Sequence, residues 1–367
     1  MLNQVPLAIP YSDAVEEIPD DEAKTTQGLI DTMRSISETT FKDEGRAIRS
    51  VHAKAHGILQ AELEVLDGLP ESLAQGLFAK PGRYAAVMRF STVPGDLLDD
   101  SVSTPRGLAV KIVGVEGERL PGSEGDVTQD FVMTDGKAFG APDPKVFLAN
   151  LKLLAATTDK IEGVKKVASA VLQQVQKAII ATTGEPNSTV AQLGGVPETQ
   201  ILGTSFFTGV PLRWGDYVAK VGVTPVSAEL TALTDQPIKV NGVPNALRES
   251  MIAFFATHGG VWEVRVQLRS DAHEMPIENA AKAWPEDKSS YVTVARLTAQ
   301  PQTAWSEARS DAVDDHMMFS PWHRLAAHRP LGGVMRVRKA AYEAARAYRA
   351  EHNGKTIVEP REVSLPA

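Results

Sequence analysis

The sequence of 367 residues contains no cysteine. Without cysteine a chain forms no disulfide, has no thiol nucleophile, and binds no iron–sulfur cluster or thiolate-held metal. Any metal must therefore be held by histidine, carboxylate, methionine or tyrosine side chains, or by the donors of a cofactor. The composition, with 43% apolar and 23% charged residues, is typical of a globular protein with an ample core.

Basic residues are in the minority, with 38 Lys and Arg against 46 Asp and Glu and a net charge of −8. This balance argues against nucleic acid as a main partner, since nucleic-acid binders normally carry a basic excess. No uncharged apolar run approaches the length of a membrane span. The first residues also lack the cationic start of a secretory signal. We therefore expect a cytoplasmic protein without a membrane span or a nucleic-acid partner.

Several common catalytic motifs are missing as well. The chain has no Walker loop, no dinucleotide fingerprint and no Gly-x-Ser-x-Gly elbow. His52 and His56 stand four residues apart, but Ala53 occupies the position where a zinc protease needs glutamate. A zinc site would also need a third ligand and is therefore disfavoured; one exposed and one partly buried histidine is the simpler interpretation.

The pattern of apolar residues predicts an extended arm at 1–21, followed by a single domain at 22–367. Helical spacing begins at Asp20, and further helices are expected at 46–59, 143–156 (with Asp143 as a cap), 160–182, 245–257 and 334–353. β-branched runs predict strands at 84–92, 107–113, 131–134, 200–210, 217–223, 261–268 and 291–297. Residues 262–268 alternate strictly, which indicates a strand with one buried face.

The strands lie far apart in the sequence and do not alternate one-for-one with helices. This arrangement predicts an α+β fold with a mainly antiparallel sheet or barrel, and it disfavours a doubly wound nucleotide-binding fold. We place the barrel core at about 84–300 and a helical C-terminal part at about 311–353.

Three separated parts of the chain carry distinctive motifs. Residues 49–57 (RSVHAKAHG) resemble the segment that carries the distal histidine of haem catalases. Residues 87–93 (VMRFSTV) and 105–111 (PRGLAVK) resemble their next two strands. Residues 338–342 (RKAAY) have the Arg-x-x-x-Tyr spacing of their proximal ligand helix. The order and separation of these motifs agree with the family.

The resemblance implies a catalase-like antiparallel β-barrel with surrounding helices, whose C-terminal helix carries the axial ligand of haem b. Tyr342 matches that ligand. A ligating tyrosine must be a phenolate, and Arg338, four residues earlier on the same helix face, favours the anion. From the residue pattern alone, an amphipathic surface helix with an inward tyrosine is the alternative.

On the opposite haem face, the resemblance assigns the catalytic role to His52. A neutral imidazole within hydrogen-bond reach can move a proton from one peroxide oxygen to the other. Ser91 would face the same pocket, because it lies two residues after Arg89 on one strand face. A core histidine bonded to a backbone carbonyl is the alternative for His52. His56 is the second candidate by chemistry, but it has no family counterpart.

Arg49 and Arg89 match the residues that pair with the haem propionates, and Phe139 matches the aromatic ring stacked over the porphyrin. Surface ion pairs are the alternative for the arginines. Ordinary core packing is the alternative for Phe139.

The sequence departs from the family pattern at the asparagine that stands beside the distal histidine in catalases. The matching segment, residues 125–131, has Val127 at or near that position and contains no asparagine. Gln129 or Thr128 would be the substitutes for a polar contact. From its length we expect the chain to have neither the long wrapping region nor the additional C-terminal domain of catalases, and we expect no bound nicotinamide nucleotide.

The resemblance implies a haem-dependent peroxidase or catalase-type oxidoreductase. Its substrates would be hydrogen peroxide or organic hydroperoxides together with a reducing co-substrate, and it would act through an oxoferryl intermediate. One alternative is rearrangement of fatty-acid hydroperoxides, as in catalase-related allene oxide synthases. Another is a non-redox barrel that binds an apolar ligand. By analogy with relatives we expect a homodimer or homotetramer, in which the N-terminal arm could exchange between subunits.

Overall fold

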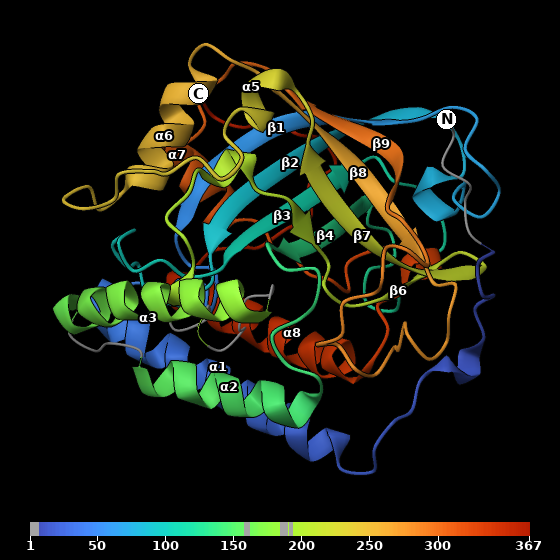
Figure 1. Ribbon diagram of the computed structural model, residues 1–367, viewed down its shortest axis with the longest axis horizontal. Helices are drawn as coiled ribbons and strands as arrows, with labels where there is room; N and C mark the ends of the chain where they lie inside the picture. Colours follow the sequence, from blue (N-terminus) through green and yellow to red (C-terminus); the bar gives the residue numbers. More distant parts are fainter. Residues whose placement is uncertain (1–6, 158–161, 184–189, 191–193) are drawn as a thin grey trace.

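A closed barrel of eight antiparallel strands forms the centre of the molecule (Figure 1). The structure is a computed structural model, and it describes residues 7–157, 162–183, 190 and 194–367. The barrel strands are β1 (Ala55–Val65), β2 (Gly82–Thr92), β3 (Arg106–Val113), β4 (Thr128–Thr134), β5 (Phe206–Phe207), β7 (Tyr217–Pro225), β8 (Gly260–Leu268) and β9 (Val292–Ala299). Strand β5 pairs with β7, and β9 pairs back with β1, which closes the ring. A short strand, β6 (Leu212–Trp214), pairs with β7. The expected α+β fold with an antiparallel barrel is confirmed.

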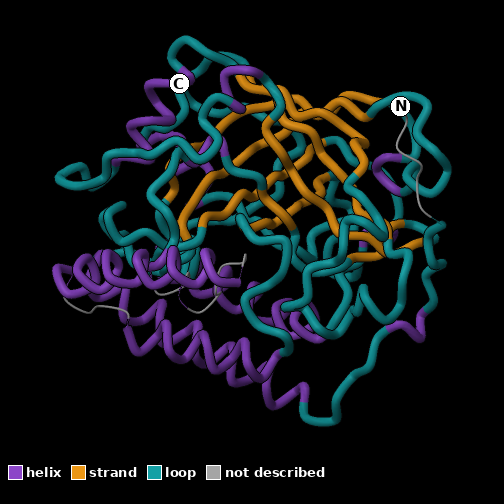
Figure 2. Tube along the Cα trace, viewed as in Figure 1, coloured by secondary structure: helices purple, strands orange, loops and turns teal. Residues whose placement is uncertain are grey.

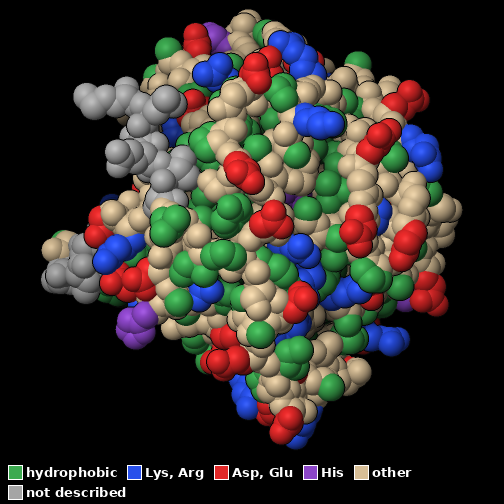
Figure 3. Space-filling model, turned by 90° about the vertical axis from the view of Figure 1, so that its right-hand side faces the viewer, with side chains coloured by type: hydrophobic (Ala, Val, Ile, Leu, Met, Phe, Trp, Pro, Cys, Tyr) green, Lys and Arg blue, Asp and Glu red, His purple; other side chains and the backbone are tan. Residues whose placement is uncertain are grey.

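Helices surround the barrel: α1 (Glu22–Glu44), α2 (Pro144–Thr157), α3 (Glu162–Thr183), α5 (Ala228–Thr231), α6 (Ala246–Phe255), α7 (Glu307–Ser310) and α8 (Gly333–Asn353). The long helices α1, α2, α3 and α8 gather on one side of the strands (Figure 2). An apolar cluster that includes Leu29, Leu151 and Val337 joins α1, α2 and α8. No helix in the described ranges is long and apolar enough to cross a membrane. Acidic and basic side chains are interspersed on the face shown in Figure 3.

Two of the predicted helix boundaries have clear local causes. Asp143 accepts hydrogen bonds from the backbone N–H groups of Lys145 and Val146 at 2.8 and 2.9 Å, and Pro144 occupies the first helical position. At the other end of the chain, Gly354 stops α8 with a left-handed backbone, at a φ of 60°. Both the predicted cap and the predicted end are confirmed.

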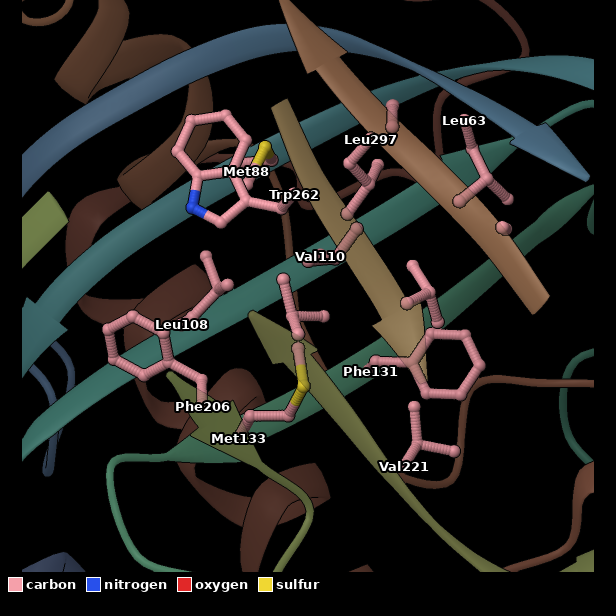
Figure 4. Packing of buried hydrophobic residues seen from close by; sticks show 14 of the residues in the cluster. Leu63, Met88, Leu108, Val110, Phe131, Met133, Phe206, Val221, Trp262 and Leu297 are labelled. Atoms are coloured by element: carbon pink, nitrogen blue, oxygen red, sulfur yellow. The ribbon is translucent and has the colours of Figure 1, made fainter. Parts of the chain in front are cut away.

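Side chains fill the interior of the barrel. Leucine, valine, methionine and aromatic side chains from facing strands point toward one another (Figure 4). In β8, Trp262, Val264 and Val266 are buried while Glu263 and Arg265 are partly exposed, which confirms the predicted alternation as far as Val266. It fails at Gln267, which is buried and donates to the carbonyls of Trp284 and Ser289. The internal cavity found among the described residues holds about 10 Å³, roughly the space of one water molecule. The interior of the barrel is therefore closely packed with side chains.

The expected helix at 46–59 is wrong. The structure has a loop up to Lys54 and then β1, which pairs with β2 on one side and β9 on the other. Apolar residues such as Ile48, Val51 and Ile58 happen to recur at helical spacing, but tertiary strand pairing overrides that local pattern. The barrel consequently begins at Ala55, before the expected boundary near 84.

The expected strand at 200–210 is largely wrong as well. It contains a 3₁₀ turn, Ile201–Gly203, and only the two residues of β5. Gly203 allows this turn to pack closely against the main chain of Leu233, because a Cβ at position 203 would lie only 2.4 Å from it. The three-residue strand β6 was not predicted. The first two residues of the expected helix at 160–182 lie outside the described residues, and α3 occupies the rest.

The described part of the N-terminal arm, residues 7–21, lies along its own chain. The Arg213 guanidinium stacks 4.5 Å from the ring centre of Tyr11. Glu16 accepts hydrogen bonds from Arg329 and Arg336, each at 2.7 Å. Arg336 also pairs with Glu22 of α1, at 2.8 Å. These ion pairs anchor the first turn of α8.

A buried ionic cluster attaches the segment after α8 to the barrel. Lys111 of β3 contacts Asp130 of β4 at 2.7 Å and Glu359 of the C-terminal segment at 2.6 Å. The exposed side-chain fractions of the three are 0%, 0% and 9%. Because two buried carboxylates depend on one ammonium group, this lysine is essential to the cluster.

Replacing Lys111 by methionine keeps the length of the side chain and removes the charge. We expect Lys111→Met to lower the free energy of unfolding by about 3–5 kcal/mol in urea titrations, because it leaves buried carboxylates unpaired. The control is Lys145→Met, which removes an exposed pair with Asp21 and should cost less than about 1 kcal/mol. Equal effects of the two variants would contradict this account of the cluster.

Candidate functional site

A cavity lies beside strands β2, β3 and β4, between them and helices α1 and α8. Five of the seven predicted site residues line it: Arg49, His52, Arg89, Ser91 and Tyr342. They come from the loop before β1, from β2 and from α8, which are far apart in the sequence. Much of the remaining wall is apolar and consists of Met33, Val51, Leu108, Ala109, Val132, Met133, Met318, Phe319 and Ala345.

His52 has an unusual backbone conformation. Its φ is 54°, in the left-handed region that residues other than glycine rarely adopt. Its N–H donates to the carbonyl of Val93 at 2.7 Å, and its carbonyl accepts from Nη2 of Arg89 at 2.9 Å. Nδ1 of the imidazole lies 3.0 Å from Oγ of Ser91. Strained residues held in this way cluster at active sites.

Gly107 makes room for the His52 ring. It lies opposite Ser91 in the β2–β3 ladder. A Cβ built on Gly107 would lie 2.5 Å from Cε1 and 2.6 Å from Nδ1 of His52. The absence of a side chain at 107 is therefore a condition for the observed position of His52. Gly107 stands within one of the sequence motifs, but no role was predicted for it.

Electrostatics keep His52 neutral. Burial lowers the pKa of His52 to about 3, and the positive charges of Arg89, Arg338 and Arg49 add to this effect. An unprotonated imidazole at physiological pH can accept a proton. His56, by contrast, does not line the cavity; it is fully buried, with Nε2 3.2 Å from Oγ1 of Thr92. Burial likewise lowers the pKa of His56, so it too is a neutral, packed histidine.

Three arginines gather at one edge of the cavity: Arg89 and Arg349 are buried, and the side chain of Arg49 is 11% exposed. Nε of Arg49 and Nε of Arg89 both donate to Oδ1 of Asp314, at 3.2 and 2.6 Å. Arg349 of α8 donates from Nη2 to the carbonyl of Met317, while its buried Nε has no hydrogen-bond partner. Burial, together with the charge of Arg49, lowers the pKa of Arg349 to about 9.

The cluster therefore has two more guanidinium groups than directly bonded carboxylates. Arg349 and Asp314 were not predicted from the sequence. Arg349 follows Tyr342 by seven residues, which places both on one helix face. That spacing was the available signal, whereas nothing in the sequence connected Asp314 with the motifs.

Arg338 and Phe139 do not line the cavity. Nη2 of Arg338 donates to Oη of Tyr342 at 2.8 Å, so Arg338 contacts the tyrosine oxygen without lining the cavity. The Arg338 guanidinium also lies 5.3 Å from the ring centre of Phe139. Phe139 packs edge-on against Phe147, with ring centres 5.1 Å apart. The geometry thus brings Arg338 to Tyr342 and leaves Phe139 outside the wall.

The expectation that Thr128 or Gln129 supplies a polar contact at the cavity is wrong. In the β3–β4 ladder Thr134 pairs with Gly107, whereas Thr128 pairs with Val113; at about 3.3 Å per residue these positions lie roughly 20 Å apart. Oγ1 of Thr128 donates to Glu359, and Oε1 of Gln129 accepts from the N–H of Leu325. Both side chains therefore serve other contacts.

Gly107→Ala tests how closely the barrel fits His52. We expect the added methyl group to lower the free energy of unfolding by about 1–3 kcal/mol through overpacking. In a His52→Ala background the same substitution should cost much less, because the clashing ring is gone. Thermal unfolding of the four proteins of this cycle measures both costs. Equal costs in the two backgrounds would show that the two residues do not constrain each other.

Comparison with protein-family models and with curated proteins finds no match to this sequence. Solved structures do match. One is a fungal catalase with a TM-score of 0.60 and 18% identity, over 90% of this chain and 66% of that one. Another is catalase A from Saccharomyces cerevisiae, with a TM-score of 0.58 and 17% identity, over 95% of this chain and 68% of that one. The chain thus spans about two thirds of the length of these catalases, and it has the catalase-like fold.

Proposed function

We propose that this chain binds haem b in the cavity and reduces hydrogen peroxide or organic hydroperoxides at the expense of a reducing co-substrate. One observation carries the proposal: His52 and Tyr342 line one cavity together with the arginine cluster. The likeness to catalases supports it, since those proteins have the same fold. The arginine guanidinium groups and the Tyr342 hydroxyl at this cavity support the proposal further.

The charge of the site suits a dicarboxylate. Arg49 and Arg89 share hydrogen bonds with a single carboxylate, that of Asp314, whereas Arg349 donates only to the carbonyl of Met317 and its Nε has no partner. Haem b carries two propionates, which would balance the two remaining positive charges. The apolar walls suit the porphyrin. These features fit the cofactor.

Tyr342 would hold the iron. Its hydroxyl accepts a hydrogen bond from Arg338 at 2.8 Å, and a charged donor at that distance stabilises the phenolate that ligates iron. When bound, haem supplies an iron centre that binds peroxide and exchanges electrons with it. Arg49, Arg89 and Arg349 would bind its carboxylates.

His52 would move the proton. In peroxide reduction the proton on one oxygen must reach the other as the O–O bond breaks, so that the leaving oxygen departs as water or an alcohol. His52 is neutral and can take this proton, and Ser91 orients its ring through Nδ1. Because no asparagine stands in segment 125–131, His52 and Ser91 would orient the peroxide without one. Product analysis distinguishes reduction of a fatty-acid hydroperoxide to an alcohol from its rearrangement without a reductant.

Tyr342→Phe tests the assigned iron ligand. We expect this variant to retain much less haem than the wild type, or to lose the phenolate-type visible spectrum, because phenylalanine cannot ligate iron. Tyr348→Phe is the matched control, since Tyr348 lies on the same helix but stacks on His352 away from the cavity. An unchanged spectrum in Tyr342→Phe would remove Tyr342 as the ligand.

His52→Ala tests the proton acceptor. We expect the rate constant for peroxide to fall by about 10²–10⁴-fold while haem stays bound, because a general acid–base group is lost. His56→Asn, outside the cavity, is the control and should keep the wild-type rate.

The pH dependence follows from the same residue. Since the pKa of His52 is lowered to about 3, falling pH protonates it only in strongly acidic solution. We therefore expect the wild-type rate constant for peroxide to stay level from about pH 8 to pH 5 and to fall below that. Stopped-flow measurements over this range provide the check. A loss of half the rate near pH 6.5, the ordinary histidine value, would contradict the assignment.

A further inference from the structure

Asp314 is the carboxylate that two of the four arginines lining the cavity, Arg49 and Arg89, both contact. It lies in the π-helical turn Asp311–Asp315 that follows α7. Turns of this kind are frequent at functional sites. Besides the two arginine contacts at Oδ1, Oδ2 accepts a hydrogen bond from the Ser310 hydroxyl at 2.9 Å. Both carboxylate oxygens are therefore bonded, and the side chain has little freedom to move.

Arg89 connects Asp314 to the main chain of His52. Its Nε donates to Asp314 at 2.6 Å, while its Nη2 donates to the carbonyls of His52 and Ala53 at 2.9 and 3.2 Å. The planar guanidinium fixes the angle between these donors, so a change at one end moves the other. Arg89 is only 3% exposed. A buried charge of this kind requires partners on each side.

The left-handed backbone of His52 needs such support. A residue other than glycine in this conformation costs on the order of 1–3 kcal/mol unless its surroundings hold it there. On one side of His52, its N–H is bonded to Val93. On the other side, its carbonyl is bonded to Arg89. Loss of the second contact would let the loop relax and the ring turn away from Ser91.

Asp314 remains charged in this setting. Burial alone would raise the pKa of Asp314, but Arg89 and Arg49 lower it below its ordinary value. A charge-assisted hydrogen bond is about twice as strong as a neutral one. The aspartate therefore orients Arg89 more firmly than an uncharged side chain would.

We propose that Asp314 is a positioning residue for His52, acting through Arg89. The assignment of a catalytic role to His52 rests on the proposed function. The hydrogen bonds that connect Asp314, Arg89 and His52 do not depend on it. Asp314 does not serve cofactor binding in this account. Removing its charge leaves Arg49, Arg89 and Arg349 free for carboxylates and should not weaken haem binding.

Asp314→Asn in the haem-bound protein tests the proposal, with cyanide as the probe. Hydrogen cyanide binds haem iron as the anion, so its proton must pass to a nearby base, here His52. We expect the rate of cyanide binding to fall by about tenfold or more, while haem affinity and the resting visible spectrum stay as in the wild type. The control is Asp315→Asn, because Asp315 pairs with Arg46 and does not line the cavity. A normal cyanide rate in Asp314→Asn, or loss of haem in parallel with the rate, would overturn the proposal.

A second measurement tests the link whether or not haem binds. Asp314→Asn should lower the melting temperature of the wild-type protein. In a His52→Gly background it should lower the melting temperature by less than half as much, because glycine adopts a left-handed backbone without strain. Additive shifts, with the same loss in both backgrounds, would show that Asp314 does not act on His52. If the chain binds no haem, the proposed function fails, and this cycle still decides the positioning role.

Discussion

The constraint on which the site depends is the burial of the Arg89 charge. Arg89 stands in β2 with 3% of its surface exposed, and a charge in that position is tolerated only if its hydrogen bonds are satisfied. Its partners are Asp314 and the carbonyls of His52 and Ala53. The guanidinium of Arg89 thus joins strand β2 to the loop before β1 and to the π-helical turn Asp311–Asp315. The strained backbone of His52 is one consequence of that arrangement.

Helix α8 completes the site from the opposite side. Its first turn is anchored by Arg336, which pairs with Glu16 of the arm, Glu22 of α1 and Glu278. Its apolar face packs on α1 and α2. From this fixed position α8 brings Tyr342 to the cavity that His52 lines. The ion pairs at the start of the helix are therefore part of the support of the site, although they lie outside it.

The sequence pattern within a segment correctly predicted the strands and helices whose own residues favour that structure. Strands β2, β3 and β8 have β-branched runs or strict alternation, and α8 has strong helix formers and a glycine stop. The segment 46–59 was mispredicted because pairing with two distant strands overrides its helix-like spacing. The positions of Thr128 and Gln129 follow from the register of β3 and β4, which a single sequence does not reveal.

The candidate site divides in the same way. Short motifs identified Arg49, His52, Arg89, Ser91 and Tyr342, because their spacing within each segment carries information. Asp314 was missed because its role exists only where three remote segments meet. Phe139 was expected at the cofactor but packs against Phe147 and Arg338 outside the cavity wall. Motif matching therefore identified residues that line one cavity, whereas the contacts of Asp314 and Phe139 emerge only from the tertiary structure.

Titration of the purified wild-type chain with hemin, followed by visible absorption, tests the central claim most directly. The account predicts saturation at one haem per chain, with a Soret band and the high-spin spectrum of a phenolate-ligated iron. A folded protein that stays colourless, or that takes up hemin without saturation at one equivalent, would contradict it.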